Sequence, residues 1–224
     1  MSLIHIPQLL MPEELRLIDD LFAQSQFVDG TKTASLAAKS VKNNLQIDKN
    51  DTTTLPQLQS IINNALASSP IFQISALPQR IYPIMFSKYL AGMTYGWHVD
   101  SPTMGTPPIR TDLAMTIFLS DPHTYEGGEL MIHGSQGITS YKPNKGDAVL
   151  YPCMYLHCVN PITRGERRAA ITWVQSQVGN TDKRQILFNL NQIHGLLFQK
   201  DPHSLETNLL LQTHSNLLRM WLAE

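Results

Sequence analysis

The stretch from Tyr95 to Asp100 contains the residues best suited to bind a metal ion. His98 and Asp100 are two positions apart, so in an extended strand their side chains would point to the same face. An imidazole and a carboxylate on one face are two of the three groups of a facial triad, which holds non-haem Fe(II) and leaves coordination positions open. The His-X-Asp pattern is frequent by chance, so a metal site requires a third ligand from elsewhere in the chain.

His157 is the predicted third ligand. It follows an apolar run and a turn, and lies far enough beyond His98 for the chain to return to the same site on another strand. The chain has eight histidines, and the others lack comparable neighbours. We interpret these others as surface or hydrogen-bonded core histidines: His5, His123, His133, His194, His203 and His214.

Arg167 is the predicted anchor for an anionic co-substrate. It begins a predicted strand, and an arginine buried inside a barrel is costly unless it meets an anion. Its planar fork matches a carboxylate. A metal triad and one such arginine together suit a molecule that chelates the metal at one end and carries a carboxylate at the other, as 2-oxoglutarate does. Arg168 is predicted to face away, because neighbouring strand residues point to opposite sides.

The elements that must position these residues change character along the chain. Residues 12–24 and 55–67 have amphipathic helical spacing, and residues 30–50 are predicted to be mostly loop. From Arg80 to Gln177, many short apolar runs separated by Gly and Pro turns predict a sandwich or barrel of strands. Two helices are then predicted, one opened by Asp182 and ending near residue 198, the other opened by Asp201 and Pro202 and ending near residue 222.

Composition narrows the function class. The 224 residues include 42% hydrophobic and only 16% charged residues, which predicts a compact folded protein. The formal charge is −1 and no stripe of Lys and Arg is present, which argues against a nucleic-acid partner. No run reaches the roughly 20 apolar residues that span a bilayer, and no signal peptide is readable. With two cysteines, the chain is expected to be cytoplasmic.

These motifs resemble a known family. The spaced set His98-X-Asp100, His157, Arg167 and Trp173 resembles the Fe(II)/2-oxoglutarate-dependent dioxygenases of the prolyl 4-hydroxylase type. More closely, the stretch 95–100, the stretch 126–130 (Glu-Gly-Gly-Glu-Leu) and the helical tail resemble the bacterial PKHD-type hydroxylases. The resemblance extends over nearly the whole chain.

The resemblance implies a fold, a site and a reaction. The fold would be α+β, with a double-stranded β-helix (jelly-roll) core and added helices. Fe(II) would be held by His98, Asp100 and His157, and 2-oxoglutarate by Arg167, with Tyr89 also contacting the co-substrate. The reaction would couple decarboxylation of 2-oxoglutarate by O2 to hydroxylation of a C–H bond, and members of the family are described as ascorbate-dependent. The substrate implied is a peptidyl proline or a small molecule related to iron uptake.

The expected organisation has three regions: supporting helices and loops at 1–78, the jelly-roll core at 79–180 and a helical appendage at 181–224. The appendage has an apolar face, which predicts docking against the barrel or against a second copy of the chain in a homodimer.

Other interpretations compete with this one. A cupin-like metalloenzyme that does not use 2-oxoglutarate would explain the triad but not the arginine, and a non-catalytic β-sandwich interaction module would explain only the fold. Cys153 and Cys158 are interpreted as core residues because they lack the Cys-X-X-Cys spacing of a zinc site. Trp97 and Trp173 are interpreted as barrel packing. Arg110 could form a surface salt bridge or meet the substrate.

Overall fold

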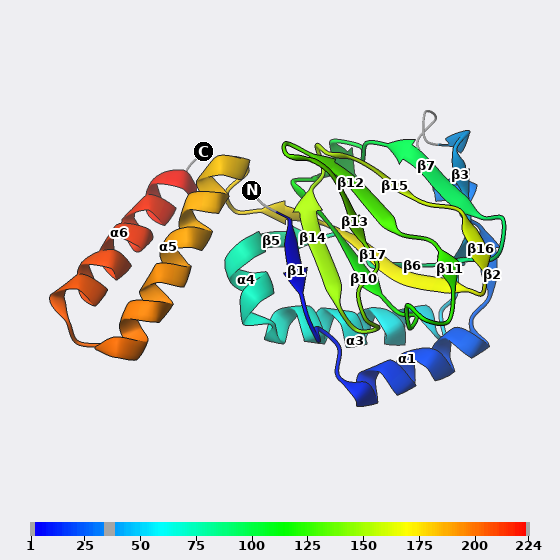
Figure 1. The fold of residues 1–224 in the computed structure, drawn as a ribbon, viewed down its shortest axis with the longest axis horizontal. Coiled ribbons are helices and arrows are strands. Elements are labelled where there is room, and N and C mark those ends of the chain that lie inside the picture. The colour runs from blue at the N-terminus through cyan, green and yellow to red at the C-terminus, as the bar shows by residue number, and fades with distance from the viewer. Residues whose placement is uncertain (1–2, 34–38, 223–224) are drawn as a thin grey trace.

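The computed structural model describes residues 3–33 and 39–222, which form two facing antiparallel β-sheets with helices outside them (Figure 1). The larger sheet has the order β1-β14-β10-β17-β6-β4-β2, with β5 beside β17. Its strands are β1 (Ile4–Ile6), β2 (Phe27–Asp29), β4 (Leu45–Ile47), β5 (Pro78–Ile81), β6 (Met85–Tyr89), β10 (Leu113–Phe118), β14 (Ala148–Pro152) and β17 (Arg167–Ser176).

The smaller sheet has the order β13-β12-β15-β7-β3 and faces the larger one. Its strands are β3 (Lys42–Asn43), β7 (Thr94–His98), β12 (Leu130–Gly134), β13 (Gly137–Tyr141) and β15 (Leu156–Val159). Two short pairs complete the strands: β8 (Thr103–Met104) with β9 (Ile109–Arg110), and β11 (Glu126–Gly127) with β16 (Ile162–Arg164). This is the expected α+β architecture with a jelly-roll core.

Helices α1 (Pro12–Gln24), α3 (Leu55–Ser68) and α4 (Pro70–Ala76) cover the outer face of the larger sheet (Figure 1). Strand β10 contributes to two hydrophobic cores, because its alternate residues face opposite sides of the sheet. Leu113, Met115 and Ile117 join the core beneath the helices, whereas Ala114 and Phe118 join the second core, between the sheets. The inter-sheet core supports the candidate site.

Helices α5 (Thr181–Lys200) and α6 (Leu205–Leu222) form an antiparallel hairpin that projects beyond the β-sheets (Figure 1). Its link to the rest of the protein is close to the start of α5, where Arg184 and Leu187 are buried. No helix among residues 3–33 and 39–222 is long and apolar enough to cross a membrane.

The structure differs from the predicted elements in three places. The stretch 30–50 is not mostly loop where it is described, because it contains the short helix η1 (Gly30–Thr33), β3 and β4. Its strands were hidden because polar side chains face inward, the reverse of the usual pattern. Helix α4 was not predicted. Pro70 lies in its first turn, where the missing N–H of proline costs little. The caps also shift: Asn180 caps α5, and α6 begins at Leu205 rather than at Asp201.

Candidate active site

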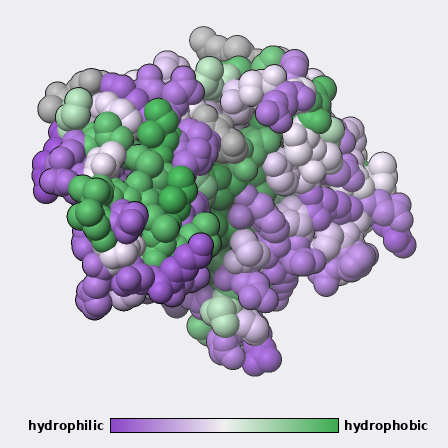
Figure 2. All heavy atoms as spheres, turned by 60° about the vertical axis from the view of Figure 1, so that its left-hand side comes forward, coloured by the Kyte–Doolittle hydropathy of each residue, from purple (hydrophilic) through white to green (hydrophobic). Residues whose placement is uncertain are grey.

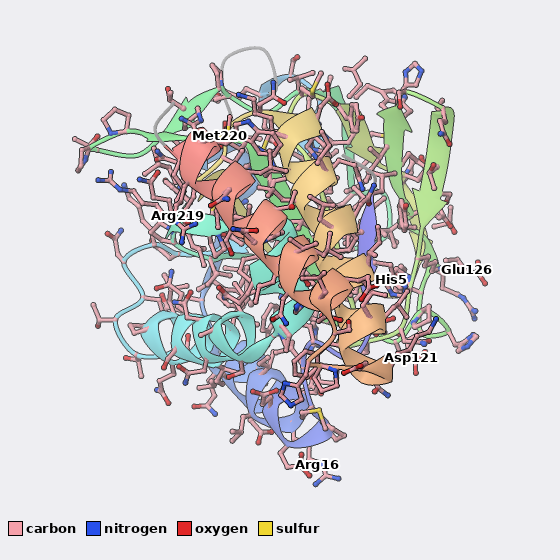
Figure 3. The ribbon with its side chains drawn as sticks, turned by 90° about the vertical axis from the view of Figure 1, so that its left-hand side faces the viewer. His5, Arg16, Asp121, Glu126, Arg219 and Met220 are labelled. Carbon is pink, nitrogen blue, oxygen red and sulfur yellow. The ribbon has the colours of Figure 1, made fainter. Side chains whose placement is uncertain are left out.

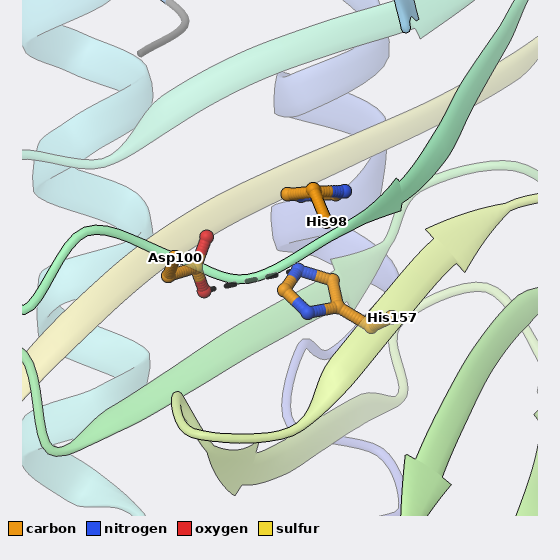
Figure 4. Close-up of side chains that lie close together, drawn as sticks. All are labelled: His98, Asp100 and His157. Atoms are coloured by element: carbon orange, nitrogen blue, oxygen red, sulfur yellow. Dashed lines mark ion pairs between the residues drawn. The ribbon is translucent and has the colours of Figure 1, made fainter. Parts of the chain in front are cut away.

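Three side chains predicted from the sequence gather at adjacent strands. His98 ends β7, Asp100 follows two residues later, and His157 on β15 is the register partner of His98. One ligand atom from each lies within 4.8 Å of the other two. Figure 4 shows the Asp100 carboxylate facing the His157 ring, with His98 beside them; Nε2 of His157 is 3.8 Å from Oδ2 of Asp100. The arrangement is a compact group of two imidazoles and one carboxylate.

A bulge in β7 places an additional ring in this group. Between the pairs His98–His157 and Tyr95–Val159, β7 advances by one residue more than β15. Such a bulge re-aims side chains beside functional sites. Tyr95 consequently shares the inner face with His98, and their rings stack with centroids 3.6 Å apart and planes 15° from parallel. The stacked phenol fixes the plane of the His98 imidazole.

Both imidazoles are oriented by backbone carbonyls. Nδ1 of His98 is 2.8 Å from the carbonyl oxygen of Gly96, and Nδ1 of His157 is 3.0 Å from that of Tyr155. If Nδ1–H donates to the carbonyl, Nε2 keeps its lone pair, as in metal-binding histidines. Burial, helped by the nearby His157, lowers the pKa of His98 to about 3, so this imidazole is neutral at physiological pH.

Asp100 is buried in a way that favours a bound cation. Its side chain is 7% exposed, and its Oδ2 has no hydrogen-bond partner among the described residues. Burial raises the pKa of Asp100, while His157 and Lys42 oppose that shift. A buried carboxylate oxygen without a hydrogen bond is costly, and a metal cation between the three side chains would compensate it. The donor set is that of a non-haem iron site.

Arg167 is 1% exposed, yet its Nε and Nη2 have no hydrogen-bond partner within the described parts of the chain. Its guanidinium lies over two rings, 5.3 Å from the centroid of Tyr89 and 5.4 Å from that of Phe118. Tyr125 also has a buried hydroxyl for which no other described residue is a hydrogen-bond partner. Burial raises the pKa of both tyrosines, which keeps them as neutral donors. These donors fit a carboxylate.

A cavity of about 100 Å³ connects the two halves of the site. Its lining includes the triad and Arg167, together with Tyr89 and Trp173. A bifunctional ligand could therefore reach the triad with one end and the guanidinium with the other. The residues present fit both an Fe(II) ion and 2-oxoglutarate.

Comparisons with known proteins agree with this site. The 2OG-Fe(II) oxygenase superfamily matches residues 84–175. A PKHD-type hydroxylase of Crocosphaera subtropica is 41% identical over 98% of this chain and 99% of its own length, and one of Maricaulis maris is 41% identical over 98% of both. The chain belongs to the PKHD-type hydroxylases.

Solved structures agree on the fold of this PKHD-type hydroxylase. A prolyl-4-hydroxylase of Pseudomonas putida matches with a TM-score of 0.55 and 16% identity, covering 78% of this chain and 92% of that protein. A prolyl hydroxylase of Trichoplax adhaerens, solved with a peptide fragment of hypoxia inducible factor, matches with a TM-score of 0.56 and 14% identity, covering 83% and 86%. At this identity the similarity establishes the jelly-roll fold alone.

Family membership identifies the reaction class. The protein is an Fe(II)- and 2-oxoglutarate-dependent hydroxylase, with 2-oxoglutarate and O2 as co-substrates. Neither a cupin-like enzyme without 2-oxoglutarate nor a non-catalytic module accounts for this membership and for a buried arginine beside the triad.

The other residues that the sequence analysis singled out either lie away from the cavity or line it with an uncharged side chain. Arg110 pairs with Asp112 at 2.7 Å, which is the salt-bridge interpretation. Arg168 faces away from the cavity, as expected, and pairs with Glu166. Trp97 is 45% exposed, so its interpretation as barrel packing is wrong. Strand alternation accounts for this, because Trp97 directly precedes the inward-facing His98 and therefore points to the outer face.

Trp173 packs between the sheets and lines the cavity, as predicted for a packing residue. Both cysteines are free and buried, and neither belongs to the group of described residues that could hold a metal ion.

Sequence reasoning missed several residues of the cavity. Tyr95 gave no signal, because a tyrosine is equally common in packing. The polar residues Lys42, Asn44 and Gln46 also line the cavity. Their alternation with less buried residues was readable, but it appears inside a stretch that otherwise has the composition of a loop.

Proposed function

We propose that His98, Asp100 and His157 hold Fe(II) and that Arg167 binds the distal carboxylate of 2-oxoglutarate, with Tyr89 as a neighbouring contact. The observation that carries this proposal is the pairing, in one cavity, of three potential metal ligands with an arginine whose buried Nε and Nη2 have no hydrogen-bond partner among the described residues. Bound Fe(II) supplies the oxidative chemistry that couples loss of CO2 from 2-oxoglutarate to hydroxylation of a C–H bond.

The protein's own contribution is orientation and shielding. The carbonyls of Gly96 and Tyr155 fix the two imidazoles, and Tyr95 limits rotation of His98. The guanidinium of Arg167 fixes the far end of the co-substrate, so the chelating end is held toward the triad. The core between the sheets and a smaller apolar cluster of Tyr89, Tyr125, Val159 and Ile162 shield the reacting groups from water.

The experiment is metal and co-substrate binding under anaerobic conditions. Fe(II) and 2-oxoglutarate together should give a weak visible metal-to-ligand charge-transfer band, and O2 should then release succinate. His157→Ala should remain folded but lose stoichiometric Fe(II), measured by elemental analysis. His133→Ala is the matched control, because His133 is an exposed neighbour on β12. Full iron retention in His157→Ala would move the third ligand elsewhere.

The primary substrate follows from the family only in outline. The relatives are hydroxylases, and structural neighbours include prolyl hydroxylases. We propose two candidate classes, a peptidyl proline and a small molecule related to iron uptake. Incubating the Fe(II)-loaded protein with 2-oxoglutarate and either a proline-containing peptide library or a metabolite extract would separate them. The product is recognised by the mass of one added oxygen atom.

We further propose L-ascorbate as the reductant that maintains Fe(II), and a cytoplasmic location. Ascorbate is supported by the family resemblance alone; its test is whether succinate release continues longer with ascorbate than without it. The location is supported by two cysteines that are both free and buried, as suits a reducing compartment. Fractionation of the source cells would test it.

We propose that the appendage 181–224 pairs with a second copy of the chain. Large apolar side chains are exposed along the hairpin, among them Ile193, Leu196 and Leu209, and Figure 2 shows a broad hydrophobic face there. No charged residue occurs between positions 185 and 199 or between 207 and 218. Two copies of such a face would meet without charge repulsion, and two hairpins can pack as a four-helix bundle.

The oligomeric state tests this pairing. Wild type should sediment as a dimer, and Leu196→Asp combined with Leu209→Asp should give a folded monomer that still binds Fe(II). Ile138→Asp is the control, because Ile138 is similarly exposed but lies on β13. A monomeric wild type would contradict the proposal.

A further inference from the structure

The segment 42–46 has its polar residues on the inside. Lys42, Asn44 and Gln46 are 8%, 3% and 5% exposed, whereas Asn43 is exposed. Charged and amide side chains are seldom this buried unless they interact with other polar groups, because each loses hydration on burial. All three line the cavity that holds the triad and Arg167.

This segment joins the two sheets on one side of the cavity. In β3, Lys42 pairs with Tyr95 of the smaller sheet; in β4, Gln46 pairs with Ser87 of the larger sheet. The three polar side chains therefore form a wall that runs from the side of β7 to the side of β6. We call these three residues the polar wall.

Lys42 brings the polar wall close to the metal ligands. Its Nζ lies 5.2 Å from the ring centroid of Tyr95, and that ring stacks on His98. The carboxylates that act on Lys42 are Asp100 and the exposed Asp29. Burial lowers the pKa of Lys42 to about 8, so the ammonium is still mostly protonated at neutral pH. A cation thus faces the space next to the candidate iron site.

The charge of the complete site indicates what this cation is for. Among the described residues that line the cavity, Asp100, Arg167 and Lys42 carry charged side chains. Divalent iron, dianionic 2-oxoglutarate, Asp100 and Arg167 together sum to zero. Lys42 leaves one net positive charge in a shielded cavity, which an anion would compensate.

We propose that the polar wall binds an anionic group of the primary substrate, a carboxylate or a phosphate, with Lys42 as the counter-ion and the amides of Asn44 and Gln46 as hydrogen-bonding groups. This inference rests on the proposed function, because it assumes that the cavity holds metal and co-substrate. It narrows the substrate to an acidic molecule or an acidic peptide.

The test follows the Lys42 side chain directly. Protein carrying lysine labelled with ¹³C at Cε is loaded with diamagnetic Zn(II) and saturated with 2-oxoglutarate. It is then titrated with acetate, inorganic phosphate or neutral acetamide. The Lys42 resonance is assigned by its loss in Lys42→Met. Acetate or phosphate should shift it saturably, and acetamide should not. Lys88 on strand β6, whose Nζ lies over the Phe27 ring, serves as the internal control.

Each outcome decides between alternatives. A response to acetate alone indicates a carboxylate substrate, and a response to phosphate indicates a phosphorylated one. Equal shifts of Lys42 and Lys88, or no shift of Lys42, would overturn the inference. So would a loss of more than about tenfold in 2-oxoglutarate affinity in Lys42→Met, because Lys42 would then bind the co-substrate. Failure to form the complex with Zn(II) and 2-oxoglutarate would instead refute the proposed function.

Discussion

At the scale of single residues, the cavity is surrounded by buried polar atoms that make no hydrogen bond among the described residues. They belong to Asn44, Asp100, Arg167 and Trp173. Each such atom costs about 1–3 kcal/mol in the unliganded protein. A ligand that satisfies them recovers this free energy on binding, so the same atoms that lower stability raise affinity for a metal ion and a carboxylate.

Arg167→Ala should weaken 2-oxoglutarate binding by about a hundredfold or more, because loss of a shielded bidentate contact costs a few kcal/mol. Fe(II) content should be unchanged, and high 2-oxoglutarate should partly restore the charge-transfer band and succinate release. Arg167→Lys should be milder, since a cation remains. Arg168→Ala is the control, because Arg168 pairs with Glu166 outside the cavity. Unchanged affinity in Arg167→Ala would place the anchor elsewhere.

Lys42 should make the free energy of unfolding increase as the pH rises above about 8. Its pKa is about 8 in the folded protein against 10.5 ordinarily. Between these values the unfolded chain holds a proton that the folded one has released, so unfolding takes up a proton and stability rises with pH. Relative to Lys42→Met, the metal-free protein should gain about 1 kcal/mol between about pH 8 and pH 9.5, measured by urea denaturation. Parallel pH profiles for the two proteins would contradict this.

At the scale of elements, the bulged strand β7 positions most of the site. It carries Tyr95 and His98 on one face and leads directly to Asp100. Its close partner β3 approaches at Gly96, whose N–H donates to the carbonyl oxygen of Val41 at 2.8 Å. A Cβ on Gly96 would lie 2.9 Å from Cβ of Val41, closer than side chains normally approach. Glycine therefore permits the strand spacing that this site uses.

Gly96→Ala should weaken Fe(II) binding by about tenfold, since small misplacements of ligands are costly. Combining it with Val41→Gly should recover part of the loss, and the non-additivity measures the contact in a double-mutant cycle. Gly195→Ala is the control: its Cβ would meet nothing within 4 Å, and this helical site should gain about 0.5–1 kcal/mol of stability. Metal affinity is read by chelator competition.

At the scale of the whole molecule, we propose that residues 1–78, 79–180 and 181–224 are regions of one folding unit. The appendage is joined to the β layers near Arg184, whose Nη1 donates to the carbonyl oxygens of Val178 and Gly179, each at 2.7 Å. Burial lowers the pKa of Arg184. The start of the hairpin is thus held by a buried cation that binds the backbone it follows.

Arg184→Ala should destabilise the protein by about 3 kcal/mol, because it removes the donor to the carbonyls of Val178 and Gly179 and opens a cavity. Fe(II) and 2-oxoglutarate binding should be unaffected at permissive temperature. Arg219→Ala is the matched control; Arg219 lies on the hairpin surface (Figure 3) and contacts Asn216 only through an exposed hydrogen bond. Urea denaturation measures both, and equal stabilities would contradict the role assigned to Arg184.

The sequence was sufficient for the regular parts of the protein and for the motif residues. Helix α1, helix α3 and the strands around His157 follow from apolar periodicity. The shared face of His98 and Asp100 follows from alternation, and His157 follows from its position after an apolar run and a turn. The polar wall could not be predicted, because its inward direction depends on pairing with distant strands β6 and β7. Tyr95 required knowledge of the bulge, which no local pattern reveals.

The short N-terminal strands also determine how the protein would behave if cut. β1 lies beside β14, β4 beside β6, and β3 beside β7, so residues from the first quarter of the chain cover three strand edges. A fragment that begins at residue 79 would leave those backbone N–H and C=O groups ready to pair with other chains. Such a fragment should self-associate through these edges, so the N-terminal strands protect the β layers from aggregation.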